Sequence, residues 1–150
     1  LRTQERAREL LLESSSLISS HGTVLLVIQD SHPVVSAIAR WNVAPLLKRE
    51  LSERTELQLP PSVFSIVLVM DQSIGIQIVN GLKKALTEGR IPQSSHIYGP
   101  TEISRGQVKI VIHSDKKDSQ ALTDVVHELQ RRRSIAKKDL FTLRVEPYSL

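Results

Sequence analysis

The sequence predicts an α/β protein in two parts: the end of a parallel α/β lobe over residues 1–58, and an α+β domain over residues 59–150. Three observations predict this division. Apolar residues recur with a helical period before the boundary and with a period of two after it. Between these patterns stand Pro60 and Pro61, which lack backbone N–H groups and disfavour helical geometry in the residues before them. The preceding helix must therefore end there.

The first part is expected to contain helices around one buried strand. Residues 2–18 show an amphipathic pattern that predicts a helix, with an apolar side made of Ala7, Leu10, Leu11, Leu17 and Ile18. Residues 23–28 form a nearly continuous apolar run, typical of a strand buried on both faces of a parallel sheet. Residues 30–33 are expected to end that strand and to start a short helix through Arg40. Asn42 can cap a further helix with Pro45 in its first turn.

The second part is expected to have the element order βαββαβ, with two helices on one face of a four-stranded antiparallel sheet. Strands are expected at 63–70, 96–98, 107–113 and 141–146, and helices at 74–87 and from Asp118 or Ser119 onward. In the third strand, apolar residues alternate with Lys109 and His113, so one face is buried and the other open. Gly89 stands where a helix end needs left-handed geometry, and the Gly-Pro pair at 99–100 is expected to end the short second strand.

The charge of the chain is unevenly distributed. Residues 1–60 carry seven Lys or Arg and seven Asp or Glu, whereas residues 61–150 carry thirteen and nine, so the whole net charge of +4 lies in the second part. A basic surplus on a small domain indicates a polyanionic partner, although a solvated basic surface explains the charge equally well. The chain has no cysteine, which excludes disulfides and cysteine-bound zinc and fits a cytoplasmic protein. No apolar run approaches the roughly 20 residues that span a bilayer, so no membrane partner is expected.

The sequence offers no catalytic or metal-binding residues. It shows no glycine-rich phosphate loop, serine elbow or paired carboxylates. The five histidines, which show no metal-ligand spacing, are His21, His32, His96, His113 and His127. We therefore expect neither catalysis nor a cofactor in this chain. Trp41, the single tryptophan, is expected to pack in the core rather than to stack on bases.

Two groups of cations are candidates for nucleic-acid binding. The first follows the last helix and consists of Arg131, Arg132, Arg133, Lys137 and Lys138. Cations complement a helix C-terminus, but that role does not require five of them, so we expect phosphate contacts. The second group, Lys109 and Arg144, is expected on the open face of the sheet. An RNA-binding sheet with the same element order is an alternative, but it needs aromatic residues where Lys109 and Val111 stand.

Several short segments resemble one known family. They are ELSER at residues 50–54, LQLPP at 57–61, IYGP at 97–100 and RVEP at 144–147, together with the apolar strand and Trp41 in the same order. In combination they resemble the C-terminal part of the PriA family, the primosomal protein N′ of bacterial replication restart. Residues 1–58 would then be the end of helicase lobe 2, and residues 59–150 the C-terminal domain.

The resemblance implies a function and partners. Members of this family are ATP-dependent DNA helicases that recognise branched DNA at stalled forks and help to assemble the primosome. The arginine motif that reaches the nucleotide is absent from residues 9–18, which resembles the actinobacterial branch with degenerate helicase motifs, so we expect no ATP binding here. The implied partners are branched or single-stranded DNA, other primosome proteins, and the acidic tail of single-stranded DNA-binding protein, near Lys116 and Gln120. A purely structural or protein-docking module without catalytic activity is the remaining alternative.

Overall fold

The computed structural model describes residues 3–19, 21–27 and 33–147, and the chain divides into two compact units, Leu1–Leu57 and Gln58–Tyr148. In the described part of the first unit there are three helices: α1 (Thr3–Ser16), α2 (Pro33–Ala39) and α3 (Ala44–Glu56). Pro45 lies in the first turn of α3, as expected, but Val43 and not Asn42 occupies the N-cap position. Asn42, one residue earlier, accepts a 3.2 Å hydrogen bond from the backbone N–H of Ala44. No helix in the described ranges is long and apolar enough to cross a membrane.

Charged side chains join α1 to α3. Arg8, which is buried, donates to Glu50, and Arg54 contacts both Glu50 and Glu5 at 2.7 Å. Burial acts to raise the pKa of Glu50, but the hydrogen bonds and charges of Arg8 and Arg54 outweigh it and hold that pKa below its usual value. An ionic network therefore connects α1 and α3 in unit 1.

Three expectations for unit 1 are wrong. Residues 23–27 form no strand, and Leu25 and Val27 are 88% and 90% exposed. A strand of a parallel sheet needs neighbouring strands for its backbone hydrogen bonds, and the described part of this unit contains none. Trp41 has a φ of 47° and is 61% exposed instead of packing in a core. The expected apolar side of α1 is largely exposed, as at Leu10 and Leu17. Residues 28–32, including His32, lie outside the described residues.

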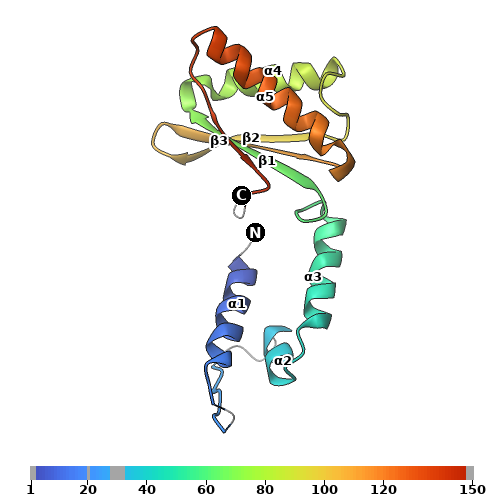
Figure 1. The fold of residues 1–150 in the computed structure, drawn as a ribbon, viewed down its shortest axis with the longest axis vertical. Coiled ribbons are helices and arrows are strands. Elements are labelled where there is room, and N and C mark those ends of the chain that lie inside the picture. Colours follow the sequence, from blue (N-terminus) through green and yellow to red (C-terminus); the bar gives the residue numbers. More distant parts are fainter. Residues whose placement is uncertain (1–2, 20, 28–32, 148–150) are drawn as a thin grey trace. The chain divides into compact units, whose positions relative to one another are not determined.

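Unit 2 has the predicted βαββαβ order (Figure 1). Its elements are β1 (Phe64–Asp71), α4 (Gln72–Thr87), β2 (His96–Ser104), β3 (Gln107–Ser114), the 3-10 turn η1 (Lys116–Asp118), α5 (Ser119–Ile135) and β4 (Thr142–Val145). The four strands pair antiparallel in the order β2-β3-β1-β4, with β1 and β3 in the centre. Figure 1 shows α4 and α5 on the same face of this sheet. The predicted α+β architecture of the second part is thus confirmed.

The core lies between the sheet and the two helices. Alternate residues of the central strands point into it, and they are fully buried together with side chains of both helices: Ile66, Leu68, Ile110, Ile112, Leu82, Leu122 and Val126. Burying a side chain of this size stabilises the fold by roughly 1.5–3 kcal/mol. The core therefore fixes which face of every strand is covered and which is open.

Local signals set the ends of the elements. Asp71 caps α4 by accepting a 2.8 Å hydrogen bond from the backbone N–H of Ser73. A hydrogen bond with the Ser73 side chain, and then this backbone one, lower the pKa of Asp71. Gly89, at a φ of 70°, ends α4 as predicted, because the N–H groups of Gly89 and Arg90 bond back to the carbonyls of Leu86 and Ala85. The helix therefore ends in a left-handed turn at Gly89, and two carbonyl groups of its last turn accept hydrogen bonds there.

The second and last strands differ in length from the prediction. β2 does not end at Gly99; it bulges there and continues to Ser104. Gly99 has a φ of 103°, and an added Cβ would lie 2.7 Å from the carbonyl oxygen of Lys109. Only glycine fits at this bulge, so the Gly-Pro pair marks an irregular strand rather than the end of one. β4 is shorter than expected and covers only Thr142–Val145.

Candidate nucleic-acid interface

The face of the sheet opposite the helices carries two rows of side chains. Strand residues alternate between faces, so Val67 and Val69 of β1 lie on the opposite side from the core residues Ile66 and Leu68. In the first row the register aligns Arg144, Val67, Val111 and Tyr98. In the second row it aligns Thr142, Val69, Lys109 and Thr101. We call these two rows the open face. Within it Val67 is buried at 4% exposed, whereas Thr101, Thr142 and Arg144 are exposed.

Lys109 and Arg144 both lie on the open face, as the sequence predicted, but their strands β3 and β4 do not pair with each other, because β1 lies between them. Strands are spaced by about 4.8 Å and same-face residues by about 6.8 Å, so the two Cα atoms lie about 12 Å apart. Arg144 is exposed and Lys109 is half-buried. Neither side chain forms an ion pair within the described part of the chain. No Asp or Glu stands in either row.

Tyr98 adds an aromatic ring at the edge of the open face. Its side chain is 50% exposed, and its ring packs edge-on against His113, with the centroids 5.2 Å apart. Sequence reasoning missed this residue because the second strand was expected to end beside it. The signal was its position in the alternating pattern, one residue before the bulge. Lys109 lies on the neighbouring strand, and a cation near an exposed ring suits phosphates and bases.

Buried histidine and serine side chains lie beside these rows. Burial, followed by the charge of His96, lowers the pKa of His113, against a backbone hydrogen bond with Gln58 that raises it. His113 Nε2 and the hydroxyl of Ser65 on the paired strand are buried without a hydrogen-bond partner in the described residues. The neutral imidazole is therefore the favoured form in the folded chain.

The structure divides the arginine cluster at the end of α5. Arg131 and Arg132 are exposed, and both bind the carboxylate of Glu128, at 2.6 Å and 2.7 Å. The hydrogen bonds from Arg131 and then Arg132 lower the pKa of Glu128 to about 2. Arg133 is 8% exposed, and its Nε donates to the carbonyl oxygen of Asp139 at 2.7 Å. Arg133 thus secures the loop that leads to β4 instead of facing solvent.

The two lysines of the cluster lie in that loop. Lys137, at a φ of 51°, and Lys138 are both exposed, and neither has an ion-pair partner among the residues that the structure describes. The cluster therefore presents four exposed cations and one carboxylate, where the sequence alone suggested five free cations.

Lys116 and Gln120 lie near the start of α5. Lys116 opens the turn η1 and is exposed, while Gln120 donates to the carboxylate of Asp124 at 2.8 Å. The intervening Lys117 pairs with Asp115 at 3.2 Å, which raises the pKa of Lys117. Asp118, at the N-cap position, accepts from the hydroxyl of Ser94 at 2.6 Å instead of capping α5. Docking of a partner tail here stays a prediction.

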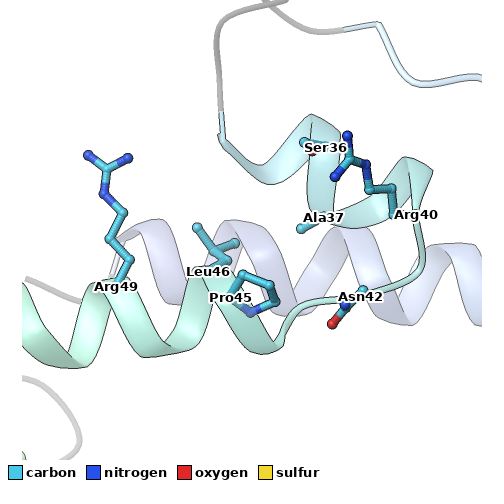
Figure 2. Close-up of a pocket in the computed structure, with 7 residues that line it drawn as sticks. All are labelled: Ser36, Ala37, Arg40, Asn42, Pro45, Leu46 and Arg49. Atoms are coloured by element: carbon cyan, nitrogen blue, oxygen red, sulfur yellow. The ribbon is translucent and has the colours of Figure 1, made fainter.

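A small cavity in unit 1 was not foreseen from the sequence. It encloses about 280 Å³ between α2 and α3, and Figure 2 shows Arg40 and Arg49 at its two ends with Ala37, Pro45 and Leu46 between them. Arg49 is engaged by Glu53 at 2.8 Å. Among the described residues, no group of three or more His, Cys, Asp or Glu side chains could hold a metal ion.

The comparisons with known proteins give one informative relative. No protein-family model matches the chain. Over 109 residues it is 30% identical to the probable replication restart protein PriA of Mycobacterium leprae (strain TN). This chain is related to PriA. The match covers 71% of the chain and 16% of that PriA protein, so the chain spans a small part of its relative's length. The resemblance to the PriA family is thereby confirmed.

Proposed function

We propose that this chain is the DNA-binding part of a replication restart protein, which recognises branched DNA at stalled forks and helps to assemble the primosome. In this proposal, residues 1–58 are the end of helicase lobe 2 and residues 59–150 are the C-terminal domain of a PriA-type protein. The relation to PriA supports the replication-restart context. The site on unit 2 supports the contact with DNA.

One observation carries the proposal. The two rows of the open face hold Arg144 and Lys109, each without a carboxylate partner in the described residues. Tyr98 lies on the edge strand β2 beside the strand of Lys109, and Arg144 lies on the opposite edge strand β4. A cation with no carboxylate partner is free to bind a phosphate, and each such contact releases a counterion from DNA. An exposed ring can stack on an unpaired base whatever its sequence. The open face therefore suits a single-stranded segment at a fork.

The composition of the central strands argues against the RNA-binding alternative. RNA-recognition sheets stack bases on aromatic residues of their two central strands. Here the open-face positions of β1 and β3 are Val67, Val69, Lys109 and Val111. With Tyr98 on the edge strand instead, backbone contacts are favoured over base-specific readout.

The proposal is tested by titrating labelled forked DNA with wild type and with K109A/R144A at several salt concentrations. Loss of two phosphate contacts should reduce the slope of log K against log salt by about 1.4 on single strands or about 1.8 on duplex. The matched control is K83A/K84A, which removes two cations from α4 on the other face of the sheet. If the control reduces the slope as much as K109A/R144A does, the open face is not the contact surface.

Tyr98 gives a second readout. Y98A should weaken binding of a single-stranded oligonucleotide by roughly 1–3 kcal/mol, whereas Y98F should retain the stacking and the affinity. If Y98A and wild type bind the oligonucleotide with equal affinity and have the same melting temperature, the Tyr98 ring does not contact the DNA.

A further inference from the structure

A groove runs between α4 and α5, on the helical side of unit 2. It encloses about 330 Å³, and its floor is apolar, made of Leu82, Ala85, Ile91, Val125 and Leu129. Leu82 and Ile91 belong to the buried core, and Val125 and Leu129 are only partly covered. Neither α4 nor α5 fills this space with its own side chains. We call it the α4–α5 groove.

Gly81 lines the groove from the middle of α4. A Cβ added there would meet nothing within 4 Å, and the residue does not have a positive φ. Neither packing nor backbone geometry therefore requires a glycine, although glycine destabilises a helix interior by about 1 kcal/mol relative to alanine. The missing side chain keeps the groove open to a molecule that approaches the helix backbone.

Two charge triads border the groove, each with two cations and one carboxylate. On the α4 side, Glu88 is shared by Lys84, at 3.8 Å, and Arg90, whose Nε donates at 2.8 Å. On the α5 side, Glu128 is shared by Arg131 and Arg132. One carboxylate neutralises only one of its two cations. Each rim of the groove therefore carries one surplus positive charge beside an apolar floor.

We propose that the α4–α5 groove binds a segment of a partner protein in which an apolar side chain is flanked by carboxylates. The apolar side chain would lie on the floor at Gly81, and the carboxylates would meet the surplus cation of each triad. A nucleic-acid backbone matches the rims but not the floor, because phosphates gain nothing from apolar surface. Charge complementarity together with the apolar floor thus selects an acidic-apolar peptide.

This groove is separate from the open face. α4 and α5 cover the face of the sheet opposite Lys109 and Arg144, so the floor of the groove and the open face can be occupied at the same time. The Glu128 triad at the end of α5 is available to either ligand. The inference does not depend on the DNA-binding proposal, and either can fail alone.

The test uses the full chain and a fluorescein-labelled ten-residue peptide with a central Leu-Phe pair and two Asp on each side. Gly81→Phe places a ring in the groove from a position where the added Cβ meets nothing within 4 Å, and it should weaken peptide binding by about tenfold or more. Asn80→Phe adds the same ring at an exposed position of α4 outside the groove and should change the affinity less than twofold. Thermal melting of both variants establishes that they are folded.

Charge reversal tests the rims. Arg132→Glu should weaken binding of the same peptide by about fivefold or more, and Lys83→Glu, an equal charge change outside the groove, should have a smaller effect. A control peptide with Lys in place of Asp should not bind. The inference is overturned if wild type shows no saturable binding of the acidic peptide up to about 1 mM, or binds the Lys peptide equally. The inference also fails if Gly81→Phe lowers the affinity for forked DNA and not for the peptide. It fails as well if sedimentation shows that wild type is a dimer and that Gly81→Phe converts it to a monomer.

Discussion

The shared carboxylate of Glu128 makes a quantitative prediction about the arginine cluster. Three consecutive arginines would add about 2.7 to the salt slope on duplex DNA if each bound a phosphate. In the structure Arg133 is buried, and Glu128 neutralises one of the pair Arg131 and Arg132. With a pKa of about 2, Glu128 stays ionised at any ordinary assay pH. The cluster should therefore contribute one arginine contact, or about 0.9 to the slope.

The variants distinguish this account from simple charge counting. R131A should lower the slope by about 0.9, and R131A/R132A should lower it no further, because Arg132 is already neutralised. E128Q should raise the slope by about 0.9, and E128Q/R131A should restore the wild-type slope. The assay is fluorescence anisotropy of a forked duplex between about 50 and 200 mM KCl, over which one contact changes the affinity about 3.5-fold. If R131A/R132A lowers the slope by twice as much as R131A, the two arginines do not share the charge of Glu128. If no variant changes the slope, the cluster does not contact DNA and serves only to cap the helix.

Three further predictions concern stability. The pKa of His113 in the folded chain is below its unfolded value of 6.5, so the unfolded chain binds the proton more strongly and the unfolding free energy should fall as the pH drops below 6.5. H113Q should reduce this fall, measured by urea titrations at pH 7.5 and 5.5. An equal fall in both proteins would show that His113 is not its cause. G99A should lower the unfolding free energy of unit 2 by about 1–3 kcal/mol in urea titrations. G106A is the comparison and should lower it less, because a Cβ added at Gly106 meets no atom within 4 Å. R133A should cost about 1–3 kcal/mol of stability and leave the salt slope unchanged, and the reverse pattern would place Arg133 on the DNA.

Local patterns predicted unit 2 well because its elements are set by neighbours in the chain. The alternation at 107–113 identified the buried face of β3, and Gly89 marked the end of α4. Unit 1 was harder because an apolar run such as 23–28 does not reveal whether neighbouring strands exist to pair with it. The interpretation of that run as a buried strand rested on its apolar composition, which is shared by strands with and without neighbours to pair with.

The candidate sites divide in the same way. Lys109 and Arg144 were predictable from strand alternation, but their alignment beside Tyr98 depends on a register set by the bulge at Gly99. The sharing of Glu128 was readable in principle, since arginines three and four residues later face it on a helix. The burial of Arg133 was not readable, because the loop after α5 determines it. The α4–α5 groove depends on how far apart two helices pack, for which the sequence gives only Gly81 as a sign.

Photocrosslinking through a single cysteine tests the central claim most directly, because the chain contains no cysteine of its own. T101C places a reactive thiol at an exposed position of the open face, in the row of Lys109, and N80C places one on the exposed side of α4. Each variant would carry an azidophenyl label and be irradiated with forked DNA. The account predicts crosslinks from T101C, lost in high salt, and none above background from N80C. Crosslinks from N80C with none from T101C would contradict it.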